Sequence, residues 1–490
     1  MSETTLADLL ALVGLPADVG AAAIPVRGVA LDTRELRPGD VFLALRGAQD
    51  HGYRHAGSAV ACGAVAVLAE APLPGELALP VPVYVAPDLR SRLARFAMRV
   101  YRSADAPPVI AVTGTNGKTS SVQFIAAGAA LLGRRPATQG TLGAGPLGQL
   151  APGTRTTPDV CANHRFLADM RAAGCDLVAM EVSSHALVQG RVDGLRFDVA
   201  VYTQLSRDHL DYHGDMQAYF EAKARLFAWP GLRHAVINLD CPRGRELARR
   251  STAPVTGYSA RGESAAALAA EDVELGHAGI GFTLRLHGER RPLRSPLLGR
   301  FNVDNLLAAC GALSALGADI DALARILPQL QPVPGRMNRL GGGKQPLVVV
   351  DYAHTPDAIE KALASLREHA PRRLAIVFGC GGERDRGKRP LMAAAAQAGA
   401  DEVWLTDDNP RGEDGDAIVA ETRAGFARPQ AVRIERDRRR AIAGAIAQAA
   451  AGDIVLIAGK GHEAWQEIAG RKLPFDDREV AAAVLAGRAA

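Results

Sequence analysis

The chain has 490 residues, of which 48% are hydrophobic and 22% charged, and its formal net charge is +4. Single hydrophobic cores stop growing near ~250–300 residues, so we expect two or three domains. The small net charge argues against a protein that coats nucleic acid, since such proteins carry a clustered basic patch or stripe.

The amino-terminal sequence MSETTLADLL lacks the basic and then apolar segments of a secretory signal. No uninterrupted apolar run reaches the ~18–20 residues of a membrane span. The six cysteines are scattered and form no Cys-x-x-Cys pair, which favours buried, reduced thiols over zinc or redox chemistry. We therefore expect a cytoplasmic protein without a membrane span.

Three segments follow one another along the chain. Residues 1–105 contain short apolar runs such as VALDTR and GDVFLAL, divided by glycine and proline, which predict strands and turns. The boundary lies within SADAPP at 103–108, which is typical of a linker, and residues 106–335 alternate strand-like runs, among them CDLVAMEV, DVAVYT and HAVINLD, with helical stretches. Residues 336–490 repeat this alternation from LVVVDYAHTPD onward. The alternation predicts α/β domains with mostly parallel sheets flanked by helices.

A candidate phosphate-binding loop, Gly114–Thr119, lies between a strand-like run and a helical pattern. Its backbone N–H groups and the helix N-terminus can bind phosphate oxygens, Lys118 can neutralise their charge, and the Thr119 hydroxyl can bind Mg²⁺. The general phosphate-loop pattern has glycine where this chain has Val112, so the loop is a shortened variant. A tight strand-to-helix turn that happens to contain Gly-Lys-Thr is the alternative.

The sequence TGTNGKTS resembles the ATP loop of Mur ligases and of the related folylpolyglutamate synthases. Later segments resemble Mur ligases over most of the chain, above all the MurE group, which makes muramoyl-tripeptides. This resemblance implies an amino-terminal uridine-nucleotide domain, a central P-loop-type ATPase domain and a carboxyl-terminal Rossmann-like domain that binds an amino acid.

The resemblance also implies the activity. With ATP as co-substrate and Mg²⁺ as cofactor, such a ligase joins UDP-N-acetylmuramoyl-L-alanyl-D-glutamate to meso-diaminopimelate through an acyl phosphate, in peptidoglycan precursor synthesis. Its partners would be these small molecules rather than nucleic acid, and we expect a monomer.

The resemblance assigns roles to residues on the ATP side. Lys118, Lys223 and His209 would be catalytic, and Lys223 would be carbamylated. The Mg²⁺ ligands would be Thr119, Glu181, His209 and Lys223. ATP would contact Gly114, Thr115, Asn116, Gly117, Lys118, Thr119, Ser120, Asn302, Asn305 and Arg336. Taken alone, Glu181 in MEVSSHAL could be a surface carboxylate and Lys223 in YFEAKARLF a solvated helix lysine.

Two further polar residues open the third segment. Asp351 and His354 in DYAHTPD could face the ATP, or Asp351 could cap a helix.

The muramoyl substrate would be bound by polar residues from the first two segments. The resemblance assigns the uridine nucleotide to Leu31, Thr33 and Gln49, and the muramoyl-dipeptide to Thr156, Thr157, Ser183, Gln189 and Arg191. This chain has Ala48 and Arg155 where some relatives have His and Asn.

Loops after strand-like runs of the third segment would bind the added amino acid. The residues that match are Arg384, Asp408, Asn409, Pro410, Arg411, Gly459 and Glu463. Arg411 could pair with the far carboxylate of meso-diaminopimelate, which lysine lacks, through two parallel hydrogen bonds. The alternatives are a solvated loop arginine, a relative that adds lysine, a folylpolyglutamate synthase, and a nucleotide-binding regulator without ligase chemistry.

Overall fold

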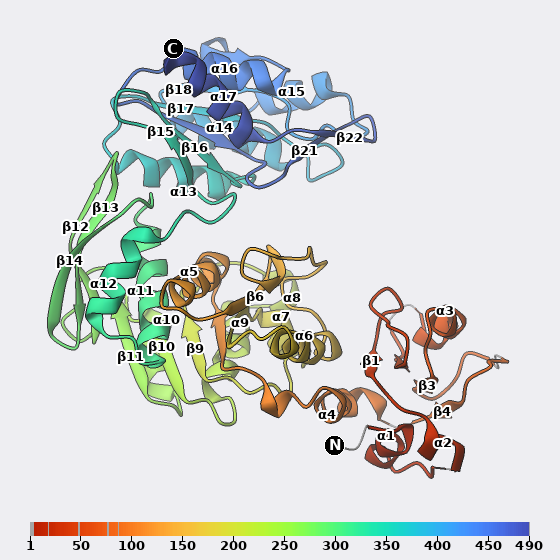
Figure 1. The fold of residues 1–490 in the computed structure, drawn as a ribbon. Helices are drawn as coiled ribbons and strands as arrows, with labels where there is room; N and C mark the ends of the chain where they lie inside the picture. The colour runs from red at the N-terminus through yellow and green to blue at the C-terminus, as the bar shows by residue number, and fades with distance from the viewer. Residues whose placement is uncertain (1–3, 18, 48–49, 76–77, 87, 490) are drawn as a thin grey trace. The chain divides into compact units, whose positions relative to one another are not determined.

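The computed structural model describes residues 4–17, 19–47, 50–75, 78–86 and 88–489 (Figure 1). The chain forms two compact units, one of residues 1–258 and 308–318, the other of residues 259–307 and 319–490. These two units are not the three domains expected from the sequence, so the domain boundaries predicted after residues 105 and 335 stay predictions.

A small parallel sheet with strand order β1-β2-β3-β4 opens the first unit. Its strands are β1 (Gly28–Ala30), β2 (Asp40–Ala44), β3 (Ala66–Ala69) and β4 (Val83–Val85), and its helices are α1 (Leu6–Leu12), α2 (Val19–Ala23), α3 (Ala56–Ala61) and α4 (Leu89–Tyr101). The strands expected in VALDTR and GDVFLAL are confirmed as β1 and β2. The polar DTR that follows β1 is a loop.

Strands of a larger sheet carry the phosphate loop, and those of the first unit follow one another in the order β11-β10-β9-β5-β8-β6-β7. The strands are β5 (Val109–Thr113), β6 (Pro136–Gly140), β7 (Gly143–Pro146), β8 (Leu177–Glu181), β9 (Val199–Tyr202), β10 (His234–Asn238) and β11 (Val255–Ser259). All neighbours are parallel except the β6–β7 hairpin. The helices are α5 (Lys118–Leu131), α6 (Val160–Ala172), α7 (Ser184–Val188), α8 (Leu210–His213), α9 (Met216–Ala224) and α10 (Pro242–Arg250).

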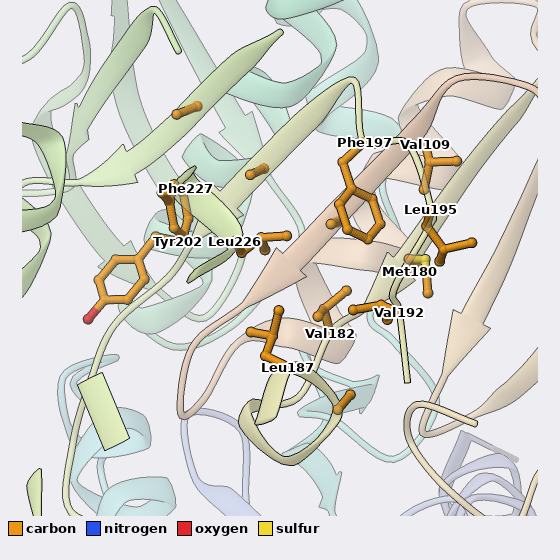
Figure 2. Packing of buried hydrophobic residues seen from close by; sticks show 14 of the residues in the cluster. Val109, Met180, Val182, Leu187, Val192, Leu195, Phe197, Tyr202, Leu226 and Phe227 are labelled. Atoms are coloured by element: carbon orange, nitrogen blue, oxygen red, sulfur yellow. The ribbon is translucent and has the colours of Figure 1, made fainter. Parts of the chain in front are cut away.

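The central strands β5, β8 and β9 are continuous apolar runs because helices cover both faces of the sheet. One core cluster joins Val109 of β5 and Met180 of β8 to Phe197 and Phe227 (Figure 2). These buried strands fix where their carboxyl ends lie, and the candidate site residues follow those ends.

The second unit contains antiparallel strands that were not predicted from the sequence, β12 (Leu268–Gly276), β13 (Gly279–Leu286) and β14 (Glu289–Ser295). Helix α11 (Phe301–Ala315) contributes to both units, and α12 (Ile320–Ile326) belongs to the second.

The last sheet of the second unit has the order β15-β16-β20-β17-β18-β19 and is parallel except for β15. Its strands are β15 (Asn338–Gly341), β16 (Leu347–Asp351), β17 (Leu374–Phe378), β18 (Glu402–Leu405), β19 (Val432–Ile434) and β20 (Ile454–Ala458), followed by the hairpin β21 (Trp465–Ile468) and β22 (Arg471–Pro474).

Helices cover both faces of this sheet. Helices α13 (Pro356–Arg367), α14 (Lys388–Gly399) and α15 (Gly415–Arg423) share one core cluster with the sheet, and α16 (Arg438–Gln448) and α17 (Asp477–Ala489) share another. The α/β fold class with a Rossmann-like carboxyl-terminal part is therefore confirmed. Within the described part of the chain, no helix combines the length and apolar character needed to cross a bilayer.

Candidate functional site

The phosphate loop has the strand–turn–helix geometry that its sequence predicts. Strand β5 ends at Thr113, and α5 begins at Lys118. Gly114 and Gly117 adopt φ angles of +150° and +86°, which residues with a Cβ rarely adopt. A Cβ on Gly114 would also collide with the Thr203 hydroxyl. The loop therefore requires glycine, and it leads into the N-terminus of a helix, where backbone N–H groups can bind an anion.

Lys118 folds back over this loop. Its Nζ donates hydrogen bonds to the carbonyl oxygens of Gly114, at 3.0 Å, and Thr115, at 2.9 Å. These contacts hold the ammonium group beside the backbone that would bind phosphate, where it can neutralise phosphate charge.

Glu181 ends β8 directly beside the phosphate loop. Its Oε1 accepts hydrogen bonds from Thr119 Oγ1, at 2.9 Å, and from the backbone N–H of Thr141, at 2.8 Å. The residue is only 2% exposed, so the alternative of a surface carboxylate is wrong. A hydroxyl and a carboxylate in contact are hard oxygen donors of the kind that Mg²⁺ takes.

Lys223 of α9 contacts the loop from another direction. Its side chain is 1% exposed, and its Nζ donates a 2.9 Å hydrogen bond to the carbonyl oxygen of Gly114. The alternative of a solvated lysine is therefore wrong. Burial, and secondly the charge of Lys118, lower the pKa of Lys223 well below its usual value, while Asp208 opposes the shift. A neutral amine is the form that reacts with CO₂, so this environment suits the expected carbamylation.

His209 precedes α8 in the loop after β9 and has a φ of +52°. Its ring centroid lies 4.9 Å from that of His185 and 6.1 Å from that of Tyr219. Across the described residues, no group of three or more His, Cys, Asp and Glu side chains is arranged to hold a metal ion. The metal role of His209 thus stays a prediction. His185 was not singled out from the sequence, although it lies in the same MEVSSHAL segment as Glu181.

The residues expected to hold the dipeptide gather at the carboxyl end of β8. Thr157 Oγ1 donates a 2.9 Å hydrogen bond to the carbonyl oxygen of Glu181 and accepts one of 3.2 Å from the backbone N–H of Ser183. Thr156 Oγ1 lies 3.3 Å from Thr141 Oγ1. Thr157 is therefore linked to the backbone of Glu181, and Thr156 is linked to the Glu181 carboxylate through Thr141, whose Oγ1 lies 3.3 Å from Glu181 Oε2.

Gln189 and Arg191 extend this network. Arg191 Nη1 donates to the carbonyl oxygen of Thr157 at 3.0 Å, and its Nε donates to Gln189 Oε1 at 2.9 Å. Gln189 Nε2 in turn donates to the Tyr212 hydroxyl at 3.1 Å. The structure brings all five dipeptide candidates into one polar network.

The uridine candidates are only partly described. Leu31 and Thr33 are half-buried and follow β1, and Asp32 between them accepts a 2.9 Å hydrogen bond from the backbone N–H of Arg34. Gln49 and Ala48 lie outside the described residues. No hydrogen bond of the described residues links Leu31 or Thr33 to the network at β8.

In the second unit, Asn302 and Asn305 lie buried on α11. Asn302 Nδ2 donates to the carbonyl oxygen of Leu298 at 2.7 Å, and Asn305 Nδ2 donates to Asn302 Oδ1 at 3.0 Å. Arg336 lies over the Tyr352 ring, 5.5 Å from its centroid. The ATP-binding roles of these residues stay predictions.

Asp351 ends β16, and its buried carboxylate accepts a 2.9 Å hydrogen bond from the backbone N–H of Met337. Burial raises the pKa of Asp351. Thr355 caps α13, so the helix-cap alternative for Asp351 is wrong. His354 is exposed, and its Nδ1 lies 2.7 Å from the carbonyl oxygen of Tyr352.

Residues expected to bind the added amino acid lie close together at the carboxyl edge of the last sheet. Asn409, which follows β18, donates from Nδ2 to Glu463 Oε2 at 2.9 Å. Lys460, which follows β20, donates from Nζ to Asn409 Oδ1 at 3.2 Å and to Glu463 Oε2 at 3.3 Å. Lys460 was missed in the sequence analysis, where only its position between two glycines could have drawn attention to it.

Asp408 is buried beside this pair. A Cβ on Gly459, whose φ is +117°, would collide with the Asp408 carboxylate, so glycine permits the close approach. Burial raises the pKa of Asp408, against the opposing charges of Arg438 and Lys460.

Arg411 and Arg384 lie in two neighbouring loops. Arg411 has a φ of +55°, its side chain is 18% exposed, and its Nη1 donates to the carbonyl oxygen of Gly382 at 2.6 Å. Its Nε lies 3.7 Å from Glu467 Oε2, whereas its Nη2 makes no hydrogen bond to a described residue. The alternative of a solvated loop arginine is therefore wrong. Arg384 is exposed.

Three family models match the chain. They are "Mur ligase family, catalytic domain" at residues 25–101, "Mur ligase middle domain" at residues 112–313, and "Mur ligase, glutamate ligase domain" at residues 335–461.

Known proteins are similar over almost the whole chain. A protein of Xanthomonas campestris pv. campestris is 54% identical, covering 98% of both chains, and one of Pseudomonas aeruginosa is 53% identical, covering 94% of this chain and 95% of its own. Both are named UDP-N-acetylmuramoyl-L-alanyl-D-glutamate--2,6-diaminopimelate ligase. A solved structure of a protein of that name is 39% identical, covers both chains completely and superposes with a TM-score of 0.75.

Proposed function

The chain belongs to the Mur ligase family, and we propose that it is an ATP-dependent ligase that adds meso-diaminopimelate to UDP-N-acetylmuramoyl-L-alanyl-D-glutamate. Full-length similarity to relatives that carry this name supports the substrate pair.

The reaction must activate a carboxylate, which is a poor electrophile at neutral pH. Transfer of the γ-phosphoryl group of ATP to the D-glutamyl carboxylate yields an acyl phosphate and ADP. The amine of meso-diaminopimelate then attacks the carbonyl carbon, the carbon–oxygen bond to phosphate breaks, and phosphate leaves as the amide forms. Charge accumulates on phosphoryl oxygens in the first step, so the site must supply cations there.

The observation that carries the proposal is the contact of Glu181 with Thr119 beside Lys118. The Thr119 hydroxyl and the Glu181 carboxylate lie 2.9 Å apart, and Lys118 is bound to the same loop. These donors fit Mg²⁺, which would neutralise phosphate charge when bound. We propose that Lys118 neutralises the phosphoryl group and that His209 and a carbamylated Lys223 complete the metal-binding set.

The dipeptide would bind next to this charge cluster. Thr157 hydrogen-bonds the backbone of Glu181, and Arg191 hydrogen-bonds the backbone of Thr157. A carboxylate held by Arg191, Thr156 and Ser183 would therefore lie close to the phosphoryl donor. Proximity of this kind accounts for much of the rate gain in group transfer.

The loops after β17, β18 and β20 would determine which amino acid the ligase adds. Glu463 and Asn409 are suited to an ammonium and a carboxylate, and Arg411 provides a cation whose Nη2 is available for a second carboxylate. Because lysine lacks that second carboxylate, this arrangement supports meso-diaminopimelate over lysine.

In the cell, we propose a cytoplasmic monomer in peptidoglycan precursor synthesis. Its activity would be required for cell-wall biogenesis, cell shape and division.

A ligation assay with purified protein tests the proposal. ADP release should require the muramoyl-dipeptide and an amine together, and the muramoyl-tripeptide should form with meso-diaminopimelate far faster than with L-lysine. Preference for L-lysine would identify a lysine-adding relative. ATP binding without any amide product would identify a nucleotide-binding regulator and would overturn the proposal.

A further inference from the structure

An arginine that the proposed reaction does not use is fully buried next to the two loops that carry Arg384 and Arg411. Arg389 lies in the first turn of α14, and its side chain is 0% exposed. Its Nη1 donates to Glu421 Oε2 at 2.6 Å, and its Nη2 donates to Glu413 Oε2 at 2.9 Å. A buried guanidinium needs such partners, because a charge that is removed from water and left unpaired destabilises the fold strongly.

The same guanidinium links the two loops that carry Arg384 and Arg411. Arg389 Nη2 also donates to the carbonyl oxygen of Gly381, at 3.1 Å, in the loop that follows β17. Its partner Glu413, in the loop that follows β18, accepts a short hydrogen bond from the backbone N–H of Glu383. This N–H and the Arg389 guanidinium hold the pKa of Glu413 below its usual value, so the carboxylate stays charged.

Direct contacts between the loops complete this connection. The backbone N–H of Gly382 donates to the carbonyl oxygen of Asn409 at 2.9 Å, and Arg411 Nη1 donates to the carbonyl oxygen of Gly382 at 2.6 Å. A Cβ on Gly382 would collide with the carbonyl oxygen of Pro410, so the two backbones touch at this point. Gly382 and Glu383 are thus bonded directly to the loop after β18, and Gly381 is joined to it through Arg389, immediately before Arg384.

We propose that Arg389, together with Glu413, is a positioning pair that sets the spacing of Arg384 and Arg411 and thereby the preference for an amino acid with a second carboxylate. This proposal rests on the proposed function, because it assumes that the two exposed or half-buried guanidinium groups meet that carboxylate. Arg389 itself does not touch the substrate, since it is enclosed by its two carboxylate partners.

The physical reason is geometric. Two parallel hydrogen bonds from arginine to a carboxylate demand a fixed orientation, and a site that is about 1 Å too loose loses much of its selectivity. Arg384 makes no hydrogen bond to a described residue, so its position depends on the loop backbone. Residues 381–383 hold that backbone, and Arg389 and Glu413 hold residues 381 and 383.

Glu413→Gln and Arg389→Lys test the positioning pair. Glutamine keeps the shape of Glu413 but removes the charge, and lysine keeps the charge of Arg389 but cannot reach Gly381, Glu413 and Glu421 together. Glu402→Gln is the matched control. It removes a carboxylate that also has arginine partners, Arg373 at 3.0 Å and Arg433 at 3.3 Å, but at the amino end of β18.

We expect both variants to raise the Michaelis constant for meso-diaminopimelate by about tenfold and to reduce its preference over L-lysine by a similar factor. The Michaelis constant for ATP and kcat should change little, and Glu402→Gln should behave like wild type. Amide hydrogen exchange at residues 381–384 should also become faster in Glu413→Gln. If Arg389→Lys does not fold, Glu413→Gln decides.

Two results separate the proposals. A folded Glu413→Gln protein with wild-type preference and wild-type exchange would overturn the positioning pair alone. Failure of the wild-type protein to use meso-diaminopimelate would overturn the proposed function, whereas faster exchange in residues 381–384 would still support the fixation of the loop.

Discussion

Replacing Arg411 with alanine separates recognition of the second carboxylate from every other step. Arg411 is held by its hydrogen bond to the Gly382 carbonyl oxygen, 2.6 Å away, and by the Glu467 carboxylate, 3.7 Å away. Its Nη2 makes no hydrogen bond to a described residue and can meet a ligand. Arg411→Ala removes that cation while the backbone hydrogen bond from Arg411 N to the Glu467 carbonyl oxygen can persist.

The size of the effect follows from burial. Removing one partner of a buried, hydrogen-bonded charge pair costs ~2–5 kcal/mol, because the other charge is left unpaired. The Arg411 side chain is 18% exposed, so water would partly solvate the ligand carboxylate in the variant. We therefore expect the lower half of that range, about 2–3 kcal/mol, which corresponds to about 30- to 150-fold in the Michaelis constant for meso-diaminopimelate.

Steady-state kinetics with each substrate varied in turn measure this effect. The Michaelis constant for ATP should change by less than about threefold, and weak activity with L-lysine should be unaffected, because lysine has no carboxylate at that end. Arg411→Lys should recover part of the loss, since it restores the charge but not the pair of parallel hydrogen bonds.

Arg433→Ala serves as the control, since Arg433 pairs with Glu402 at the amino end of β18 and lies away from the loops. A folded Arg411→Ala protein that keeps the wild-type preference for meso-diaminopimelate would refute this explanation of specificity. Equal losses with both amino acids would indicate a purely structural role.

Three other perturbations are informative. Lys118→Ala should nearly abolish ligation with an unchanged melting curve, and normal activity would contradict its role at the phosphate loop. Lys223→Ala should be inactive and partly rescued by acetate; a plain amine at residue 223 in a crystal structure with ATP and Mg²⁺ would contradict carbamylation. His369 is buried and accepts a 2.8 Å hydrogen bond from Gly299 N, and burial lowers its pKa. As the pH falls below ~6.5, this histidine is therefore protonated in the unfolded chain before it is protonated in the folded chain. The free energy of unfolding is thus highest above that pH, and it falls by up to ~1.4 kcal/mol per pH unit as the pH drops below it. Urea unfolding gives the free energy of unfolding at about pH 7.5 and at about pH 5.5, and the difference between the two values should be smaller for His369→Asn than for wild type. Equal differences would refute the role of His369 in this pH dependence.

The sequence predicted the phosphate loop correctly because its determinants are local. A buried strand, two glycines with positive φ and a helix that starts at Lys118 all lie within a few consecutive residues. The central strands of the two larger sheets were predictable for a similar reason, since burial on two faces leaves an uninterrupted apolar run.

Burial that depends on distant contacts was not predictable. Lys223 lies in an ordinary helix sequence and becomes buried only because α9 places its amine on the carbonyl oxygen of Gly114, 109 residues earlier. The buried Arg389 and Lys460 were missed for the same reason: their partners, such as Glu413 and Asn409, come from other loops.

The surroundings of Lys223 bear on which chemical form of its side chain, ammonium or carbamate, is favoured next to Lys118. An ammonium group at this position would be desolvated and would face the charge of Lys118, and both effects lower the pKa of Lys223. A carbamate at the same position would carry the opposite charge, so the neighbouring Lys118 would attract it instead. The surroundings of Lys223 thus disfavour a second cation beside Lys118, and the carbamate proposed for Lys223 would replace that cation with an anion of the kind that binds Mg²⁺.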